Sequence, residues 1–594
     1  MRLSLTRAVC PLLFSAFTTQ MGFAMGGVAL PGLTDSASFS QDRNGIWHIV
    51  AENDADAARV QGYVQCRDRF FQMDQTRRQV DGTEAELLGP GRLNSDIQAR
   101  VIGLHRAAQR SLDAMPADFR VVLEAFADGV NHCLQTLPLP PEYELLELTS
   151  ARPWEPVDTM KMGKAIAASL SLDIDTGLTQ QLSRYVDAGI NNGFDGQVFF
   201  AEDVYRSAPL DPAATVPDAT NSAPWLAQWS AKKSKHLVAA ADAAQKLDAK
   251  FADHPILALA MNRRESFVGS NEWGVTGDAT PDGRPIIAND PHLSLNVPST
   301  FWEWHIVVKD DPENGPMNVS GVGFPGAPGV VLGQNLDITW GATTNPMDVT
   351  DVFRDRLLSQ QPECTAIDAL ICLESPPGVF HRVDVEFGVQ FFVNQPDDGV
   401  DDNVVEATGL PLEAQIILTV PFRSFGPVID ITDPSVLLGG GTTDGLILQY
   451  TGFHATRELL SFNRWNRAKN LGDFLEGLKD FDVGSQNWAY ADRDGNLGYY
   501  SSAELPLRAD LESGAVVGLP PYFVRDGISG ANNWVPDEAR SQGQTIPFAV
   551  MPMEEMPQTL NPENGFFVNA NNDPAGTTLD NDPLNQIRPS TANA

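Results

Sequence analysis

The sequence predicts an α+β fold, with helices in the first third of the chain and strands after residue 270. Helical periodicity starts near Asn53 and returns over residues 119–134. After Ser270 the chain consists mainly of short apolar runs separated by Gly, Pro and Asp turns. No short-period repeat interrupts this order. Helices followed by many strands are typical of an α+β or a layered α/β architecture.

The first elements follow from local signals. Residues 39–50 predict an extended strand segment with a turn at Asn44-Gly45. A helix is expected next, because Asn53 is a typical N-cap residue and acids occupy the following turn. This helix is expected to reach Arg78, and the second amphipathic stretch stops before the Pro-rich residues 137–141.

Between residues 207 and 269 the character of the chain changes. Loop-forming residues 209–221 lead into an Ala- and Lys-rich stretch, residues 231–251, with high helix propensity. This stretch has few large apolar side chains to anchor it. Two interpretations stay open, an exposed helix or linker and a segment that is removed after folding.

The remaining elements are expected after Ser270. Asp494-Gly495-Asn496 is a hairpin turn between residues 488–490 and 497–500. One further amphipathic helix is expected at residues 468–481. Other strands are expected at residues 335–341, 383–393 and 415–420.

The chain is strongly acidic. Its formal net charge is −36, because 77 acidic residues outnumber 41 basic ones among 594 residues. Phosphate binding needs clustered Lys and Arg, so a nucleic-acid partner is not expected. With 42% hydrophobic residues, the composition is that of a globular protein. Neutral or cationic ligands, including Ca²⁺, fit this charge better.

The N-terminus has the outline of a secretory signal peptide. Arg2 and Arg7 precede a short apolar run, and a cleavage site is plausible near Ala24. The alternative is a disordered or packed N-terminus. No later window reaches about 18 uninterrupted apolar residues, so no membrane span is expected. We therefore expect residues 1–24 to be removed and the protein to be periplasmic or secreted.

Five cysteines are too few for a disulfide scaffold. Cys364 and Cys372 form a local bridge if the compartment is oxidising, or remain two thiols. Cys66 and Cys133 pair, or are buried singly.

Two motifs are rejected as functional signals. Residues 321–326 match G-x-G-x-x-G, but Pro325 and Pro328 exclude the helix that a dinucleotide site needs. Asp492-Arg493-Asp494-Gly495 starts like a calcium loop but lacks the later acids. The sequence contains no H-E-x-x-H or G-x-S-x-G, which removes the zincin and ordinary α/β-hydrolase signatures.

A set of motifs in a fixed order identifies a family. In this order the chain resembles the penicillin acylase family of N-terminal nucleophile hydrolases, from about residue 39 onward. Upstream, the resemblance includes Gly45-Ile46-Trp47-His48-Ile49, Arg67-Asp68-Arg69, Gln72-Met73-Asp74 and Arg77-Arg78. Downstream, it includes Gly269-Ser270-Asn271-Glu272-Trp273, Asp290-Pro291-His292-Leu293, Pro325-Gly326-Ala327-Pro328-Gly329, Gly333-Gln334-Asn335, Trp340-Gly341-Ala342-Thr343-Thr344, Asn487-Trp488-Ala489-Tyr490-Ala491-Asp492 and Asn569-Ala570-Asn571-Asn572-Asp573-Pro574.

The resemblance implies a fold and a processing scheme. The fold would be a four-layer αββα sandwich with additional helices. The family cuts its own chain, here between Gly269 and Ser270. The precursor would then comprise a signal peptide (1–24), a mostly helical α chain (25–206), a spacer (207–269) and a catalytic β chain (270–594), the two mature chains forming a heterodimer.

The chemistry implied is hydrolysis of a small-molecule, non-peptide acyl-amide. A serine hydroxyl needs a base, and the α-amine freed at Ser270 has a reference pKa of about 7.7–8.0. By resemblance, the Asn571 amide and the Thr344 N–H stabilise the oxyanion, and His292 orients the nucleophile or its amine. A satisfied core histidine is the alternative for His292. The alternative function is a non-catalytic, calcium-stabilised binding protein on the same fold.

A structural Ca²⁺ site is also implied by the resemblance. Its ligands would be Asp348, Thr350 through its carbonyl, Asp351, Asp582 and, from the α chain, Asp175. Oxygen donors at this spacing suit a hard cation. The alternative is a solvated acidic loop.

Two departures from the family pattern stand out. Leu293 and Leu332 occupy positions where phenylacetyl-specific members carry phenylalanine, which favours an aliphatic acyl group. Relatives also continue for well over a hundred residues beyond the position of Ala594, so we expect the sequence to be partial or the fold to lack elements. Both antibiotic-acylase and quorum-quenching roles are compatible with the resemblance.

Overall fold

A computed structural model describes residues 28–200, 215–216, 235–252, 254–256, 269–293, 295–345, 347–420, 426–512, 521–537, 548–572 and 574. The expected signal peptide and parts of the expected spacer lie outside the described residues. Helices and sheets both contribute extensively, so the α+β prediction is confirmed. Within the described part of the chain, no helix combines the length and apolar character needed to cross a bilayer.

The largest sheet has nine strands in the order β1-β2-β5-β6-β7-β8-β17-β18-β20. Neighbours are antiparallel except for β2 and β5, which are parallel. The strands span Ser38–Gln41 (β1), Trp47–Ala51 (β2), Trp302–Asp311 (β5), Gly315–Gly323 (β6), Leu332–Gln334 (β7), Ile338–Thr344 (β8), Gln486–Asp492 (β17), Leu497–Ser502 (β18) and Gln558–Leu560 (β20).

Three smaller sheets complete the described strands. A three-stranded sheet, β21-β3-β4, lies against β8, β17 and β18. A seven-stranded sheet follows the path β14-β11-β10-β9-β16-β15, with β19 paired to β9, and β12 pairs with β13. These strands span Gly269–Val275 (β3), Ile286–His292 (β4), Thr350–Ser359 (β9), Ile371–Glu374 (β10), Phe380–Phe387 (β11), Phe392–Asn394 (β12), Val404–Glu406 (β13), Ile416–Thr419 (β14), Val428–Ile431 (β15), Thr442–Tyr450 (β16), Arg525–Asp526 (β19) and Phe566–Asn569 (β21).

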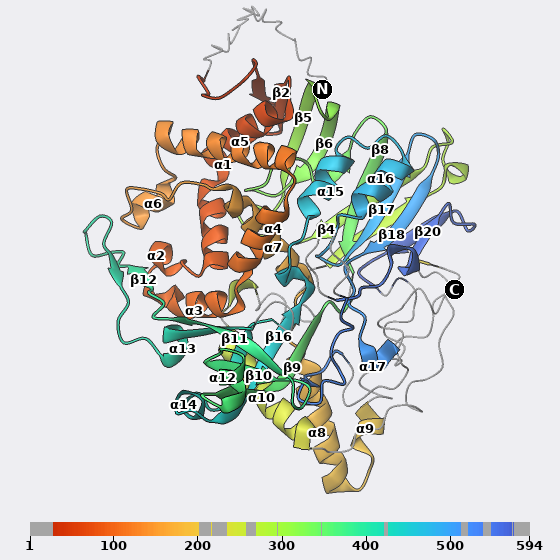
Figure 1. The fold of residues 1–594 in the computed structure, drawn as a ribbon. Helices are drawn as coiled ribbons and strands as arrows, with labels where there is room; N and C mark the ends of the chain where they lie inside the picture. The colour runs from red at the N-terminus through yellow and green to blue at the C-terminus, as the bar shows by residue number, and fades with distance from the viewer. Residues whose placement is uncertain are drawn as a thin grey trace, which may run out of the picture.

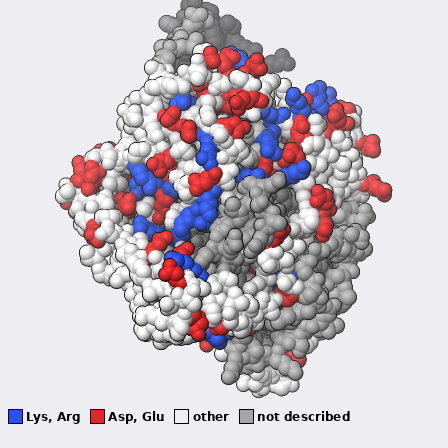
Figure 2. Space-filling model, in the orientation of Figure 1, with Lys and Arg blue, Asp and Glu red and all other residues white. Residues whose placement is uncertain are grey.

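The helices of the first third are drawn from red to yellow-orange in Figure 1, where most of those up to residue 171 lie beside the nine-stranded sheet and the last two lie at the lower end of the view. They are α1 (Asp54–Asp81), α2 (Ala85–Leu88), α3 (Leu93–Ile102), α4 (Leu104–Ala114), α5 (Ala117–Thr136), α6 (Pro141–Leu145), α7 (Pro156–Ser171), α8 (Thr176–Asn192) and α9 (Gly196–Phe199). Later helices are α10 (Lys235–Phe251), α12 (Pro362–Ala366), α13 (Leu412–Gln415), α14 (Pro434–Leu438), α15 (Glu458–Trp465), α16 (Leu471–Leu478) and α17 (Ala509–Glu512), with short 3₁₀ turns at Pro90–Arg92, Gly277–Ala279, Thr451–Phe453 and Met553–Glu555. On the face in Figure 2, acidic and basic side chains are interspersed.

Helix α1 is the central helix of this layer. Its N-cap is Asn53, as expected, and the Asn53 side chain accepts a hydrogen bond from the Asp56 N–H. Helix α1 packs on β2, β5 and α5. Glycines make the α1–α5 contact very close, since a Cβ on Gly62 would lie 2.2 Å from the Phe126 carbonyl oxygen. A disulfide between Cys66 and Cys133 joins the same two helices.

Most expected elements are found, with local differences. The hairpin of β17 and β18 and the helix over residues 471–478 agree with the sequence. The single strand expected at residues 383–393 is wrong, because Gly388 adopts a positive φ of 65° and β12 begins a separate pairing. Cys364 and Cys372 are joined in a disulfide. Residues 321–326 lead through turns to β7 in the described structure.

The interpretation of residues 231–251 as an exposed helix or linker is wrong for the part that the structure describes. Helix α10 packs on α8, and its apolar residues recur every three or four positions to form one buried face. The fully buried members are Ala240, Ala244, Leu247 and Phe251. Two of these four side chains are alanines, which is why the sequence showed few large apolar residues in this stretch.

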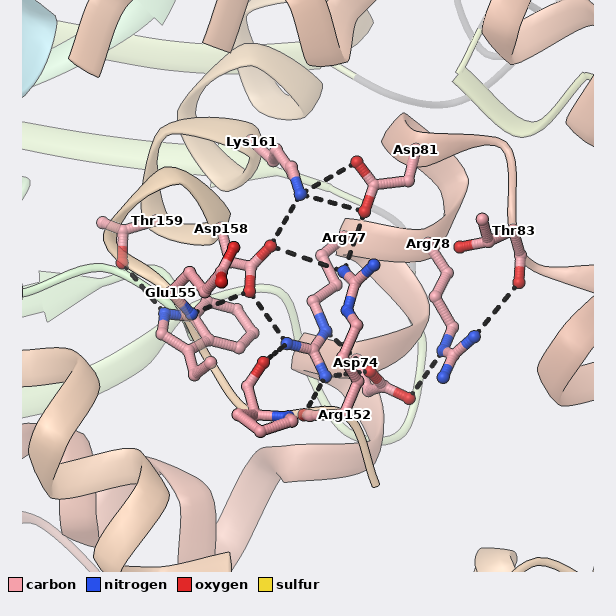
Figure 3. A network of polar contacts seen from close by, with 12 residues as sticks. Asp74, Arg77, Arg78, Asp81, Thr83, Arg152, Glu155, Asp158, Thr159 and Lys161 are labelled. Atoms are coloured by element: carbon pink, nitrogen blue, oxygen red, sulfur yellow. Dashed lines mark hydrogen bonds and ion pairs between the residues drawn. The ribbon is translucent and has the colours of Figure 1, made fainter. Parts of the chain in front are cut away.

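A network of buried charges joins α1 to α7 (Figure 3). Arg77 lies between Asp74 and Asp158, with N–O distances of 2.6 and 2.8 Å, and is fully buried. Lys161 donates to Asp158 at 2.7 Å, and Tyr143 donates to Asp74 at 2.7 Å. Burial raises the pKa of Asp74, but Arg77 and Arg78 outweigh burial and hold that pKa below its ordinary value.

We predict that Asp74→Ala lowers the free energy of unfolding by about 3–5 kcal/mol, because it leaves the Arg77 guanidinium buried without one of its carboxylates. Urea denaturation measures this change. The matched control is Asp128→Ala, which breaks the surface pair with Arg59 and should cost at most about 1 kcal/mol. Equal losses in the two variants would contradict the importance of the buried network.

Candidate active site

The candidate nucleophile lies at the start of β3, the middle strand of the three-stranded sheet. Ser270 is buried, with 9% of its surface exposed. Side chains alternate along a strand, so Ser270 and Glu272 share the face that packs on the nine-stranded sheet, and Trp273 points to the other side. The nucleophile is therefore set between two sheets.

The structure brings three predicted catalytic residues together. The Ser270 N–H donates to Asn571 Oδ1, and Asn571 Nδ2 donates to the Thr344 carbonyl at 2.7 Å. A Cβ on Gly269 would lie 3.1 Å from Asn571 Oδ1, so glycine leaves room for this contact. Asn571 itself adopts a left-handed φ of 61°, which asparagine tolerates better than most residues. Ser270, Thr344 and Asn571 thus meet although they come from distant parts of the sequence.

Strand register sets the direction of the Thr344 N–H. The Asn345 N–H donates to the Ser485 carbonyl at 2.8 Å, so this pair is hydrogen-bonded in the ladder between β8 and β17. In an antiparallel ladder, backbone groups of successive residues point to opposite sides. The Thr344 N–H and carbonyl therefore point away from β17, to the side where Asn571 lies.

A buried polar network supports Asn571. Asn569 Oδ1 accepts from the Asn571 N–H at 2.9 Å and from Thr343 Oγ1 at 2.9 Å. Asn487 Nδ2 donates to both Thr343 Oγ1 and Asn569 Oδ1, and the Tyr499 hydroxyl donates to Asn487. Asn569 therefore holds the turn that presents Asn571. The parts played by Asn487 and Tyr499 were missed, since only the register of β17 and β18 brings them there.

His292 is not brought to the serine side chain. In the ladder between β3 and β4, His292 is opposite Gly269 and Pro291 is opposite Ser270. Directly opposite residues share a face, so His292 lies on the other face from Ser270. Its side chain is 47% exposed, and its Nε2 is 3.5 Å from Asp290.

Glu272 is a buried acid that the sequence reasoning missed. It is 1% exposed, and the backbone of Ala489 gives its carboxyl only weak hydrogen-bond support. Burial raises its pKa well above the ordinary value. The sequence did indicate the position of Glu272, because a residue two positions after Ser270 in a strand faces the same side of the sheet as Ser270.

Four of the five expected calcium ligands lie close together. The Val352 N–H donates to Asp175 at 3.1 Å, and the Thr350 N–H donates to Asp348 at 3.3 Å. Arg508 also enters the cluster, since its guanidinium donates to Asp351 at 2.7 Å and to the Thr350 carbonyl at 3.2 Å. Asp582 lies outside the described residues. No motif in the sequence pointed to Arg508.

The acidic cluster formed by Asp175, Asp348 and Asp351 contains more carboxylates than the Arg508 guanidinium can neutralise. Burial raises the pKa of Asp348 to about 8, and burial and neighbouring carboxylates raise that of Asp175 well above its ordinary value. Asp348 Oδ2 and Asp351 Oδ1 are buried without a partner in the described structure. These two oxygens fit a hard cation. Still, no group of three or more His, Cys, Asp or Glu side chains in the described part of the chain has the arrangement of a complete metal site.

The two leucines expected to line the acyl pocket lie in different surroundings. Leu332 is buried in the core cluster beside the nine-stranded sheet. Leu293 is half-buried and directly follows β4. Leu293 is therefore next to the nucleophile strand, whereas Leu332 belongs to the core.

Comparison with known proteins gives a consistent result. A family model described as penicillin amidase matches residues 37–591. Penicillin acylase 2 proenzyme of Pseudomonas sp. (strain SE83) is 25% identical over 92% of this chain and 60% of its own. Penicillin G acylase of Escherichia coli is 24% identical over 92% of this chain and 61% of its own. The acyl-homoserine lactone acylase QuiP of Pseudomonas aeruginosa is 28% identical over 56% of this chain and 36% of its own.

The chain thus spans about 60% of the length of the first two of these relatives. Among solved structures, a thermostable penicillin G acylase from Alcaligenes faecalis matches with 21% identity and a TM-score of 0.36. That match covers 51% of this chain and 44% of the other.

We predict that Glu272→Gln stabilises the protein more as pH rises. The folded-state pKa lies above the unfolded value of about 4.3, so ionisation of Glu272 lowers stability as pH rises from about 4.3 through the raised pKa. Glutamine cannot ionise. The free energy of unfolding of the variant should therefore exceed that of the wild type by on the order of 1–3 kcal/mol at pH 8 and differ little from it at pH 4. Thermal unfolding at several pH values tests this, with exposed Glu303→Gln as control. A gain that is independent of pH would refute it.

Proposed function

The chain belongs to the penicillin amidase family, and we propose that it is an autoprocessed amidohydrolase that forms an acyl-enzyme on Ser270. The observation that supports this most is the meeting of Ser270, Asn571 and Thr344 through the Asn571 side chain. The named relatives are acylases, which fits the release of an acyl group from an amine. The substrate would be a small acyl-amide.

Processing would begin at the Gly269–Ser270 bond. Ser270 Oγ attacks the Gly269 carbonyl, the C–N bond breaks, and the hydroxyl proton passes to the departing nitrogen. Water then hydrolyses the resulting ester, which leaves a carboxylate on Gly269 and restores the hydroxyl of Ser270. The products are two chains and a free α-amine on Ser270.

Catalysis would use that amine as the base. Its reference pKa of about 7.7–8.0 leaves a neutral fraction near pH 7, which accepts the proton of Oγ directly or through one water. Asn571 Oδ1, which accepts from the Ser270 nitrogen in the uncut chain, would keep the amine in place. Asn571 Nδ2 and the Thr344 N–H would donate to the oxyanion, and losing one donor costs about 2.7–4 kcal/mol.

The finer architecture is part of the proposal. The three-stranded sheet lies against β8, β17 and β18, which supports two inner β layers of an αββα sandwich. Leu293 lies beside the nucleophile strand, where it would line the acyl pocket, and this supports a substrate with an aliphatic acyl group. The signal peptide expected at residues 1–24 would make the protein periplasmic or secreted. His292 would act on the amine only if the start of β3 moves after the cut, because His292 now lies on the opposite face from the serine side chain.

The extent of the spacer can be refined. Helix α10 buries four apolar side chains fully, and Lys250 donates to the Ile429 carbonyl at 2.8 Å. Removing α10 would expose this apolar face and its neighbours to water. We therefore place any second cut after Ile256, so that α10 stays with the α chain.

Calcium remains a proposal with specific support. Three buried carboxylates, on Asp175, Asp348 and Asp351, face one guanidinium, and two of their oxygens have no partner among the described residues. When bound, Ca²⁺ would supply charge neutralisation and tie the α chain to the β chain. Arg508 would supply the remaining positive charge.

Ser270→Ala should abolish both chain cleavage and amidase activity, because the variant has no hydroxyl for either attack. Activity on a chain-length series of acyl-amides, with detection of the free amine, should fall by at least about 10³-fold. Ser299→Ala, at an exposed serine, is the control and should be cut normally. A Ser270→Ala protein that still splits into two chains would remove Ser270 from this role, and a wild-type chain that stays uncut would favour the binding-protein alternative.

Mass spectrometry of the purified wild-type protein tests the extent of the spacer. We expect a second chain that begins Ser-Asn-Glu-Trp and a first chain that includes α10. A first chain ending near residue 206 would show that the helix is excised.

Chelation should destabilise the protein if the calcium proposal is correct. A ligand present at about 100 times its Kd adds about 2.7 kcal/mol to the free energy of unfolding. Removal of Ca²⁺ by EGTA should therefore lower the thermal midpoint of unfolding, and added Ca²⁺ should restore it. Asp348→Asn should lower the midpoint and remove the response to EGTA. An unchanged midpoint in EGTA would contradict a bound Ca²⁺.

A further inference from the structure

Thr215 lies in the segment expected to be a spacer, yet it is fully buried beside β21. Its hydroxyl donates to the Val568 carbonyl at 2.6 Å, and Oγ1 accepts from Asn569 Nδ2 at 3.1 Å. A threonine hydroxyl has one proton, so it acts once as a donor and once as an acceptor here. Thr215 is therefore bonded to the side chain that holds the Asn571 turn.

The Thr215 hydroxyl helps to fix which way the Asn569 amide faces. Because its proton goes to the Val568 carbonyl, Oγ1 presents a lone pair to Asn569 and can bond only the Nδ2 end. The Asn572 carbonyl also accepts from Nδ2, at the longer distance of 3.3 Å. Asn569 Oδ1 is thereby directed at the Asn571 N–H, 2.9 Å away. A reversed amide would place two donors face to face, and the turn would lose this support.

The next residue, Val216, is also part of the packed structure. Its N–H donates to the Pro574 carbonyl at 2.8 Å, and its side chain packs on an apolar cluster that includes Tyr499. Helix α10, which follows in the chain, is packed on α8. A single second cut after Ile256 would therefore keep Thr215, Val216 and α10 in the first chain.

We propose that Thr215 stays in the mature protein as a positioning residue, which orients Asn569 and, through it, the oxyanion donor Asn571. Its effect on catalysis rests on the proposed hydrolase function, whereas its hydrogen bonds do not. The nucleophile and the oxyanion donors would then belong to the second chain, and part of their support to the first.

Two substitutions separate the hydroxyl from the shape of the side chain. Thr215→Val removes the hydroxyl and should lower kcat at least about 10-fold with little change in KM, because Asn571 Nδ2 acts on the oxyanion that forms after substrate binds. Thr215→Ser keeps the hydroxyl and should restore most of kcat. The probe is whichever acyl-amide of the chain-length series the wild type cleaves fastest.

Thr159→Val is the matched control. It removes another buried hydroxyl of the first chain, which accepts from Trp154 Nε1 at 3.2 Å on α7. A general loss of stability would affect both valine variants, but Thr159→Val should keep the wild-type kcat. Thermal midpoints of all variants report whether each protein is folded.

Hydrogen exchange followed by mass spectrometry gives a readout that does not need activity. In the uncut Ser270→Ala protein, Thr215→Val should speed exchange in residues 566–572, and Thr159→Val should not. If the wild type proves uncut and inactive, the proposed function fails, and this exchange measurement still decides the role of Thr215.

Three other results would overturn the proposal. One is active, processed wild-type protein in which mass spectrometry finds no peptide containing Thr215. Another is a Thr215→Val protein with the wild-type kcat, or a Thr215→Ser protein as slow as Thr215→Val. The third is unchanged exchange of residues 566–572 when the Thr215 hydroxyl is removed.

Discussion

The hydrogen bonds of the Asn571 side chain are the interaction on which the site depends. They join the Ser270 N–H to the Thr344 carbonyl, across 301 and 227 residues of sequence. The surrounding elements serve this contact. Strand β3 is fixed between β4 and β21, and β21 leads directly into the Asn571 turn. A shift of β3 by one residue against β4 and β21 would turn Ser270 to the opposite face.

Local patterns were enough to predict several parts of the molecule. The Asn53 cap, the β17–β18 hairpin and the order of motifs around Ser270 depend on neighbouring residues, so the sequence shows them directly. The convergence of Ser270, Thr344 and Asn571 was predicted through family resemblance. It could not have been worked out from periodicity.

Other parts depend on contacts between distant segments. Tyr499 and Asn487 support the site only because β17 pairs with both β8 and β18. Arg508 enters the acidic cluster from a segment with no recognisable motif. Two of the four fully buried side chains of α10 are alanines, which give a weak hydrophobic signal until α10 packs on α8. In each case tertiary structure, rather than local propensity, decides the outcome.

The parallel pair of β2 and β5 has a consequence for the mature protein. Strand β2 belongs to the expected first chain and β5 to the second, yet five residue pairs align between them within one sheet. A cut before Ser270 would make this an intermolecular ladder. Subunit exchange between molecules would then require peeling an edge ribbon from a continuous sheet, so the two polypeptides should remain partners for the lifetime of the fold.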